Sequence, residues 1–245
     1  VGNPPYSGIS QNRGAWISSM IEDYKYVDGQ HFGERKHWLH DDYVKFIRLA
    51  ESLIEKNGEG ILGFITNHGY LTNPTFRGMR HHLLSSFDEI RVINLHGNAG
   101  SEQLSPDGEK DVNVFDIRVG VSIILAWKRS GIDKDSKLAG IRYTEMIGSR
   151  EAKQLALSQG RALLPPGSAL NPVSPYYFFR NFDHSKVAHY YDGFSLEDFF
   201  LTSSSGTITA NDGINYSFSR GEAEAKIAFI VENDVEAIRR KFGLK

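Results

Sequence analysis

The feature that most constrains the fold of this chain is an alternation of helical and extended patterns over its first 158 residues. Apolar residues that recur every three or four positions predict amphipathic helices, whereas short uninterrupted apolar runs predict buried strands. Asp41 is suited to begin one of the helices, and Asn57-Gly58 to end it. In chain order, the predicted elements are a short helix at 15–24, a helix over 41–56, a strand over 60–66, a helix over 74–87, a strand over 89–95, a long strand over 114–128, its antiparallel neighbour over 139–143 and a helix over 145–158.

This order of elements predicts an α/β fold, namely the second half of a doubly wound sheet with an antiparallel hairpin at its edge. From about residue 160 the pattern changes, and proline-containing turns indicate a linker. Residues 176–245 then alternate short strands and turns and end in a helix at about 232–242, as expected for the start of a mixed α+β domain. We therefore divide the chain into residues 1–160 and 161–245.

The most informative motif for chemistry is the turn Asn3-Pro4-Pro5-Tyr6. The Asn3 side-chain oxygen and the Pro4 carbonyl can both accept hydrogen bonds from one amino group, which would aim the lone pair of its nitrogen at an electrophilic methyl group. Two successive prolines fix φ near about −65° and remove two backbone donors, so the turn is rigid and presents only carbonyls. Tyr6 offers a flat face on which a flipped base can stack. The turn indicates methylation of an amino or amide nitrogen; the alternative is an ordinary Asn-Pro turn that leaves a strand.

Composition excludes several other functions. The chain has no cysteine, which rules out disulfides, thiolate metal sites and the thiol nucleophile that C5 methylation of cytosine requires. Its net charge of −2 argues against a uniformly basic surface for nucleic acid, although it leaves room for a local basic face. The longest apolar runs, such as 119–127, are too short to span a membrane, and no signal-peptide pattern opens the chain. The simplest interpretation is a cytoplasmic protein without a membrane partner.

Two segments resemble metal sites, but each has a simpler explanation. His37 and His40 stand beside Asp41 and Asp42, and these carboxylates are more simply placed at the start of a helix, where they favour its dipole. The segment 106–110 has the residue types of a metal-dependent nuclease, but its acidic residues follow one another too closely to surround one ion. We therefore predict no metal.

Two basic clusters are candidates for contact with DNA phosphates. Arg77 and Arg80 lie with His81 and His82 on the predicted helix 74–87, where the alternative is a solvated helix face. The cluster at 239–241 falls in the last turn of a predicted helix, where positive charge suits the helix dipole.

In order, the turn and the elements that follow it resemble an adenine-N6 DNA methyltransferase of the gamma class over most of residues 1–150. The asparagine at the first motif position, and a recognition region placed after the catalytic half, favour this class. The resemblance implies a Rossmann-like fold that depends on S-adenosylmethionine, with catalysis by Asn3, Pro4, Pro5 and Tyr6. It also implies that Phe115 packs against the face of the flipped adenine opposite Tyr6, and that Tyr43 and Phe46 lie near the adenine of the cofactor. For Phe115 the alternative is a routine core phenylalanine at a strand edge.

Residues 190–218 more narrowly resemble the entry to the recognition domain of large single-polypeptide restriction-modification enzymes. The segments that carry this resemblance are Phe199-Phe200-Leu201 and the run from Gly206 to Asp212. The resemblance implies double-stranded DNA as the partner, and nuclease or helicase domains in the same polypeptide.

The chain departs from the methyltransferase family at the cofactor motif. The family has a glycine-rich turn after its first strand and an acidic residue after its second, and this sequence lacks the pair. Gly58 to Gly63 fits the string G-x-G-x-x-G but precedes a strand and opens no helix. We therefore expect a piece of a longer enzyme, inactive by itself, whose cofactor-binding half lies upstream. Two alternatives stay open: a methyltransferase that acts on RNA adenine or protein glutamine, and a non-catalytic DNA-binding or structural module.

Overall fold

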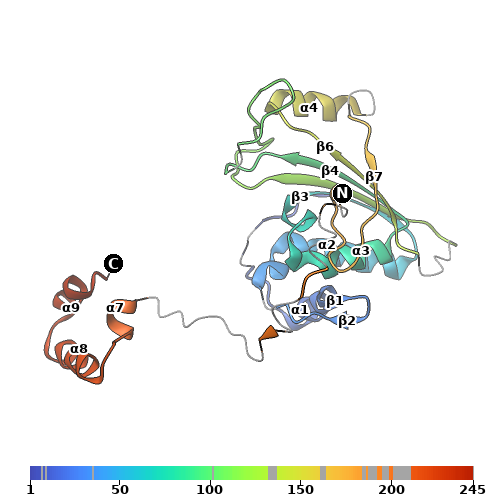
Figure 1. Cartoon of the computed structure of the whole chain (residues 1–245). Helices are drawn as coiled ribbons and strands as arrows, with labels where there is room; N and C mark the ends of the chain where they lie inside the picture. Colours follow the sequence, from blue (N-terminus) through green and yellow to red (C-terminus); the bar gives the residue numbers. More distant parts are fainter. Residues whose placement is uncertain are drawn as a thin grey trace. The chain divides into compact units, whose positions relative to one another are not determined.

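A five-stranded sheet organises the first part of the chain in the computed structural model (Figure 1). β5 runs antiparallel to both β3 and β4, β6 runs parallel to β4, and the short β7 runs antiparallel to β6. Three of the strands, β3, β4 and β6, therefore share one direction, and their carboxyl ends meet at one edge of the sheet. In spatial order the strands are β3 (Gly60–Asn67), β5 (Val121–Lys128), β4 (Glu89–His96), β6 (Gly140–Glu145) and β7 (Ser168–Leu170).

The chain divides into two units, Val1–Asp183 and His184–Lys245. The sequence pattern placed a boundary at residue 160, but β7 and the buried Phe179 belong to the first unit. The roles predicted for the two parts, catalysis and recognition, stay predictions. The structure describes residues 1–6, 8, 10–34, 36–100, 102–131, 137–160, 164–183, 186, 192–194, 199–200 and 211–244.

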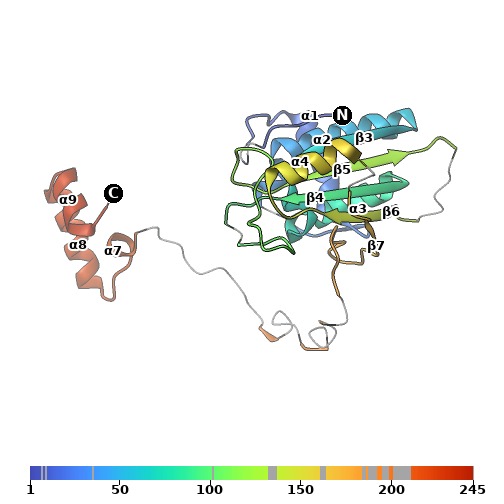
Figure 2. The same ribbon diagram turned by 90° about the horizontal axis from the view of Figure 1, so that it is seen from above.

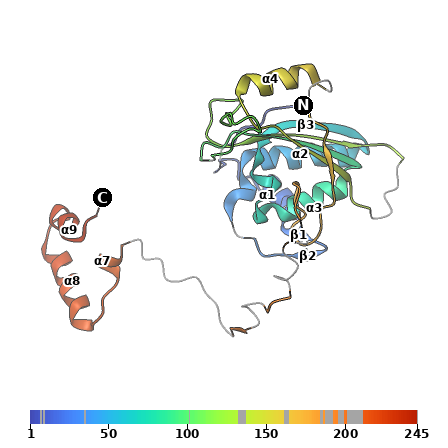
Figure 3. The same ribbon diagram turned by 45° about the horizontal axis from the view of Figure 1, so that its top comes forward.

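Helices cover both faces of the sheet (Figure 2). On one face lie α2 (Asp42–Asn57) and α3 (Arg77–Ser86), with α1 (Ala15–Glu22) and the small hairpin of β1 (Tyr26–Val27) and β2 (Gln30–His31) beyond them. On the other face lies α4 (Arg150–Gln159), as Figure 3 also shows. Short 3-10 turns complete the unit: η1 (Asp23–Lys25), η2 (His37–His40), η3 (His68–Leu71) and η4 (Pro74–Phe76).

The apolar core is divided in the same way. The larger cluster includes Ile47, Leu83, Val92 and Ile124 and joins the sheet to α2 and α3. A smaller group, which we call the upper cluster, consists of Leu95, Val114, Val121, Met146 and Ala156 and includes a residue of α4. The fit between α3 and η1 requires a glycine at position 78, because a Cβ there would lie 2.0 Å from the carbonyl oxygen of Tyr24.

Several elements predicted from the sequence are confirmed. The helix predicted over 41–56 is α2, and Gly58 ends it in the left-handed conformation, with φ of 84°. The strands predicted over 60–66 and 89–95 are β3 and β4, and the helix predicted over 74–87 is η4 followed by α3. The helix predicted over 145–158 is α4, which begins at Arg150 with a cap from the Ser149 side chain.

The predicted hairpin of 114–128 with 139–143 is wrong in two respects. Residues 114–120 lie outside the strand, since β5 begins only at Val121. Residues 140–145 pair parallel with β4 and not antiparallel with β5. The physical reason is that β5 is inserted between β3 and β4. Both of its hydrogen-bonding sides are occupied, so no edge is left for a hairpin partner.

In the second unit, residues 211–244 are mainly helical. Residues 211–244 form α7 (Asp212–Asn215), α8 (Arg220–Glu232) and α9 (Val235–Phe242), so the short strands predicted for 176–245 do not occur within this range. The predicted C-terminal helix is α9, and α8 was not predicted. The ammonium of Lys241 lies 3.6 Å from the centre of the Phe229 ring, which joins α9 to α8. The segment 201–210, on which the narrower resemblance rests in part, lies outside the described residues.

Candidate active site

The turn Asn3-Pro4-Pro5-Tyr6 lies beside β3. The amide of Gly2 donates to the carbonyl of Gly63 at 2.9 Å, and the amide of Ile65 donates to the carbonyl of Gly2 at 3.1 Å. This pairing is parallel. The turn therefore leaves the sheet at the edge where β3, β4 and β6 end. In α/β sheets, ligands bind in the crevice at this edge.

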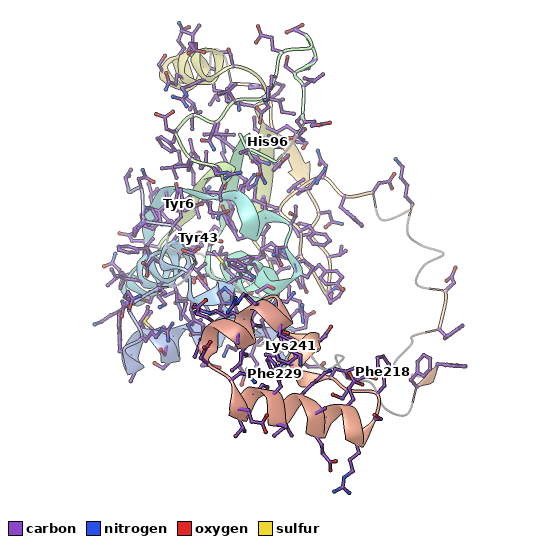
Figure 4. All side chains as sticks on the ribbon, turned by 90° about the vertical axis from the view of Figure 1, so that its left-hand side faces the viewer. Tyr6, Tyr43, His96, Phe218, Phe229 and Lys241 are labelled. Carbon is purple, nitrogen blue, oxygen red and sulfur yellow. The ribbon has the colours of Figure 1, made fainter. Side chains whose placement is uncertain are left out.

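Tyr6 is held on three sides. Its hydroxyl lies 3.1 Å from Asn3 Oδ1 and 3.3 Å from the carbonyl oxygen of Ile65, so its one proton is shared between two acceptors. Its ring meets the ring of Tyr43 edge to face, with centroids 6.2 Å apart (Figure 4). Burial raises the pKa of Tyr6 to about 12, so the hydroxyl stays a neutral donor at physiological pH. Tyr6 thus links the exposed Asn3 to strand β3.

The segment that follows the turn is anchored to α2. The buried ammonium of Lys45 donates to Ser10 Oγ at 2.9 Å and to the carbonyl of Asn12. Burial lowers the pKa of Lys45. These bonds fix the course of the chain a few residues beyond Tyr6, which limits the movement available to the turn.

Phe115 lies on a loop that its neighbours hold in place. Its ring is half-buried and packs against the upper cluster, which Tyr6 also contacts. Its backbone amide donates to Asn113 Oδ1 at 2.9 Å. The guanidinium of Arg150 donates to the carbonyls of Asn113 and Phe115 at 2.8 and 3.1 Å. The structure therefore brings both predicted stacking residues to one apolar cluster.

Asn113 in turn fixes this loop to the end of β4. Its amide group donates to the carbonyls of Gly97 and Val119 at 2.9 and 2.8 Å. Gly97 has φ of 80°, and a Cβ at this position would lie 2.4 Å from the Cα of Asn113. Sequence reasoning did not identify Asn113 or Arg150. The available signal was a polar side chain within a segment that otherwise reads as an apolar strand.

The structure contradicts the assignment of Arg80 to DNA. Arg80 has no exposed surface, and its guanidinium donates to the carbonyls of Tyr70, Asn73 and Tyr176. Arg77 is partly exposed, but its guanidinium lies 3.8 Å from the centre of the Phe32 ring and donates to the carbonyl of Pro74. These two side chains mainly hold the structure around α3 together.

The two residues predicted to lie near the cofactor differ in exposure. Tyr43 is 1% exposed and supports Tyr6 from within the core, so a ligand cannot reach its ring. Phe46 lies one turn further along α2 and is 45% exposed. Of the two, only Phe46 offers a face to a ligand.

One group of side chains between α2 and α3 has the spacing of a metal site. Glu51, Glu55 and His82 place potential ligand atoms within 4.8 Å of one another. Arg48, however, donates to both carboxylates, and His82 bonds Glu51 at 2.9 Å. Burial lowers the pKa of His82, but the hydrogen bond and charge of Glu51 outweigh burial and leave it raised. The arrangement is an ion-pair network.

Known proteins are similar to this chain in sequence and in fold. Residues 1–100 match the profile of a family described as Eco57I restriction-modification methylase. No curated protein matches the chain. Among the described residues, no helix is long and apolar enough to cross a membrane.

Solved structures with a similar fold are much longer. The ATP-dependent Type ISP restriction-modification enzyme LlaBIII bound to DNA is 22% identical, with a TM-score of 0.63 over 93% of this chain and 16% of its own. The DrdV–DNA complex is 22% identical, with a TM-score of 0.65 over 93% of this chain and 24% of its own. A nuclease-deletion mutant of the Type ISP enzyme LlaGI with a DNA substrate mimic is 20% identical, with a TM-score of 0.62 over 92% and 19%. The chain thus spans 16% to 24% of the length of these enzymes, and at this identity the likeness shows the fold alone.

Proposed function

We propose that this chain carries the catalytic turn of a DNA adenine-N6 methyltransferase that belongs to a restriction-modification enzyme. The observation that carries the proposal is the exposed Asn3 carboxamide at the carboxyl edge of the sheet, held by the Tyr6 hydroxyl at 3.1 Å. The match of residues 1–100 to a restriction-modification methylase family supports it. So does the position of Phe115 on the same apolar cluster as Tyr6.

The turn offers two acceptors to the target amino group. One N–H of the target amino group donates to Asn3 Oδ1 and the other to the Pro4 carbonyl, a group that no hydrogen bond between described residues uses. These bonds draw the nitrogen lone pair out of conjugation with the ring and direct it away from the turn. The base, flipped out of the duplex, stacks on Tyr6 and Phe115, and such stacking contributes about 1–3 kcal/mol per base. Catalysis then comes from positioning and from hydrogen bonds that strengthen as charge develops.

The methyl donor we propose is S-adenosylmethionine, which when bound would supply an electrophilic methyl carbon. The amino nitrogen would take the methyl group, the sulfur would keep the electron pair of the broken bond as a thioether, and the methylated nitrogen would release one proton to solvent. Among the described residues, Phe46 is suited to cover the adenine of this donor, since it is 45% exposed. One aromatic face is not a complete site, and the glycine-rich turn of the family is not found in this sequence. We therefore propose that further polypeptide of the same enzyme completes the cofactor site.

The sheet supports a Rossmann-like methyltransferase half as its origin. β5 lies antiparallel between β3 and β4, which are parallel to each other. On the side of β3 away from β5, Gly2 pairs with β3 in the parallel direction. We further propose that residues 161–245 begin a DNA recognition region and that double-stranded DNA is the substrate. DNA-bound enzymes of similar fold favour this substrate over RNA or protein.

The test is an Asn3→Ala variant of the complete enzyme that contains this chain. Transfer of labelled methyl groups to duplex DNA should be abolished, and DNA binding should be retained. Asn12→Ala, which changes an exposed asparagine in the loop beyond the turn, serves as the matched control and should stay active. Mass spectrometry of the product should find N6-methyladenine. Retained methylation in Asn3→Ala, or transfer to RNA or protein in preference to duplex DNA, would refute the proposal.

A further inference from the structure

A polar cavity lies at the same edge of the sheet as the catalytic turn, and the function proposed above does not use it. The cavity has a volume of about 250 Å³, enough for one nucleobase. Its wall comes from η3, from the ends of β4 and β6 and from the segment after β7. The side chains that decide its chemistry are His68, Asn94, His96, Tyr143 and Arg180.

The hydrogen bonds of Asn94 determine which groups donate and which accept in a network along the cavity wall. The backbone amide of His96 donates to Asn94 Oδ1 at 3.1 Å, which fixes the orientation of the carboxamide because an N–H can only donate. Asn94 Nδ2 then donates to the Tyr143 hydroxyl at 3.1 Å. That hydroxyl donates to Glu145 Oε2 at 3.0 Å, and His96 Nε2 lies 3.2 Å from the same oxygen.

The same hydrogen-bond network determines which ring nitrogen of His68 carries the proton. Nδ1 of His68 lies 3.1 Å from Asn94 Oδ1, and because this oxygen has no proton to give, Nδ1 must carry one. Burial lowers the pKa of His68, and the neighbouring His96 lowers it further, which favours the neutral ring. A neutral ring with its proton on Nδ1 has a free lone pair on Nε2. No described residue bonds that nitrogen.

The backbone around His68 is fitted to its ring. The His68 amide donates to the carbonyl of Gly120 at 3.0 Å. A Cβ on Gly120 would lie 2.3 Å from the imidazole, so the residue before β5 must be glycine. The position of the ring is therefore set from two sides, by Asn94 and by Gly120.

Arg180 provides positive charge at the rim of this cavity. Arg180 and Tyr143 line the same cavity. Burial raises the pKa of Tyr143 to about 12, and the charge of Arg180 opposes that rise. The preceding residue is fixed, since the Phe179 amide donates to the carbonyl of Leu71 at 3.0 Å and its ring packs against Tyr70. Arg180 is exposed and pairs with no acidic group among the described residues.

An acceptor nitrogen beside an arginine selects one class of ligand. A phosphate oxygen would meet the lone pair of His68 Nε2, which repels it, and the Glu145 carboxylate bonded to the cavity residue Tyr143 adds negative charge behind the wall. The edge of a nucleobase instead presents an N–H donor next to a carbonyl or ring-nitrogen acceptor. We propose that this cavity binds a nucleobase other than the one methylated, with His68 Nε2 accepting from its N–H and Arg180 donating to its acceptor. The inference rests on the proposed function only for the source of that base, which is the DNA.

The experiment observes the imidazole nitrogens of His68 directly. The 245-residue chain, labelled with ¹⁵N-histidine, is titrated with each of the four deoxynucleosides and separately with inorganic phosphate. We expect the Nε2 signal of His68 to move with at least one nucleoside and to be unaffected by phosphate. Arg180→Ala should weaken this response about tenfold, the size expected for loss of a charged hydrogen bond. Arg129→Ala is the matched control and should leave the His68 response unchanged, because Arg129 directly follows β5, at the end of this strand opposite to Gly120.

Other results would overturn the inference. A response to phosphate alone would identify an anion site, and no response to millimolar nucleoside would show that the cavity does not bind bases. His68→Gln, with folding checked by circular dichroism, should lose the effect of nucleoside on the His96 ring signals; a retained effect would remove His68 from the site. Asn3→Ala should keep the His68 response, so a failure of the methylation proposal is distinguishable from a failure of this one.

Discussion

Replacing Lys153 by methionine should destabilise the first unit strongly. The side chains of Lys153 and Asp111 are 1% and 2% exposed, so this ion pair is buried from both sides. All three ammonium protons have acceptors, namely the carbonyls of Leu95 and Val112, each at 2.7 Å, and Asp111 Oδ1. Removal of one partner from a buried pair costs about 3–5 kcal/mol, because the other charge stays buried without compensation. We expect a loss of that size.

The structure also indicates where this loss is felt. Asp111 Oδ2 accepts from the Gly97 amide at 2.6 Å, and Oδ1 accepts from the Gly148 amide at 3.1 Å. The carboxylate therefore ties the end of β4 and the approach to α4 to the loop that carries Phe115. Without Lys153, two backbone N–H groups remain to stabilise the charge, so the variant should still fold, with this loop loosened first.

The assay is urea unfolding followed by circular dichroism, for Lys153→Met, Asp111→Asn and the double variant. If the pair acts as described, the double variant should lose less stability than the sum of the two single changes. Lys56→Met, at an exposed position near the end of α2, is the control and should change stability by about 0.5 kcal/mol or less. A loss below about 1 kcal/mol in Lys153→Met, or strict additivity, would refute the reasoning.

Two further predictions concern Tyr6 and His82. Tyr6→Phe removes the hydroxyl that bonds Asn3 and keeps the stacking ring. The methylation rate of the complete enzyme should therefore fall by roughly five- to tenfold, the equivalent of one hydrogen bond, and its DNA affinity should not change. An unchanged turnover number would contradict this. The raised pKa of His82 means that the folded state holds its proton more tightly than the unfolded state, so its stabilisation is complete below about pH 6.5 and is lost as pH rises through the folded pKa. The excess stability of the wild type over His82→Gln, from urea unfolding between pH 6 and pH 9, should therefore shrink with pH, and a constant difference would count against the ion-pair network.

The sequence predicts the elements whose signals are local. Each of these signals lies within or next to the element that it predicts. They are the helical period of α2, the glycine that ends α2, and the apolar runs of β3 and β4. The pairing of β5 and β6 is different, because it depends on which strand edges are free in the folded sheet. Neighbours in sequence were expected to pair, and the insertion of β5 between β3 and β4 prevents it.

In the candidate site, too, local features can be predicted from the sequence and long-range contacts cannot. Asn3 and Tyr6 are the first and last residues of one four-residue motif, so their hydrogen bond follows from local chain geometry. Arg80 looks like a surface residue in the sequence, and only the folded chain shows that it meets three backbone carbonyls, one of them 96 residues away. The partnership of Lys153 with Asp111 likewise spans 42 positions and has no local pattern.

The spacing between the two proposed stacking rings is set indirectly. Tyr6 and Phe115 come from segments more than a hundred positions apart, and each is fixed by its own polar bonds, to Ile65 in one case and to Asn113 in the other. What the two rings share is the upper cluster, against which both pack. Because protein interiors are packed closely and transmit strain, a change of volume within that cluster moves both rings, although none of its residues needs to touch the base. In the function we propose, the binding of the flipped base therefore depends on the packing of α4 and β5 as much as on the turn Asn3-Pro4-Pro5-Tyr6.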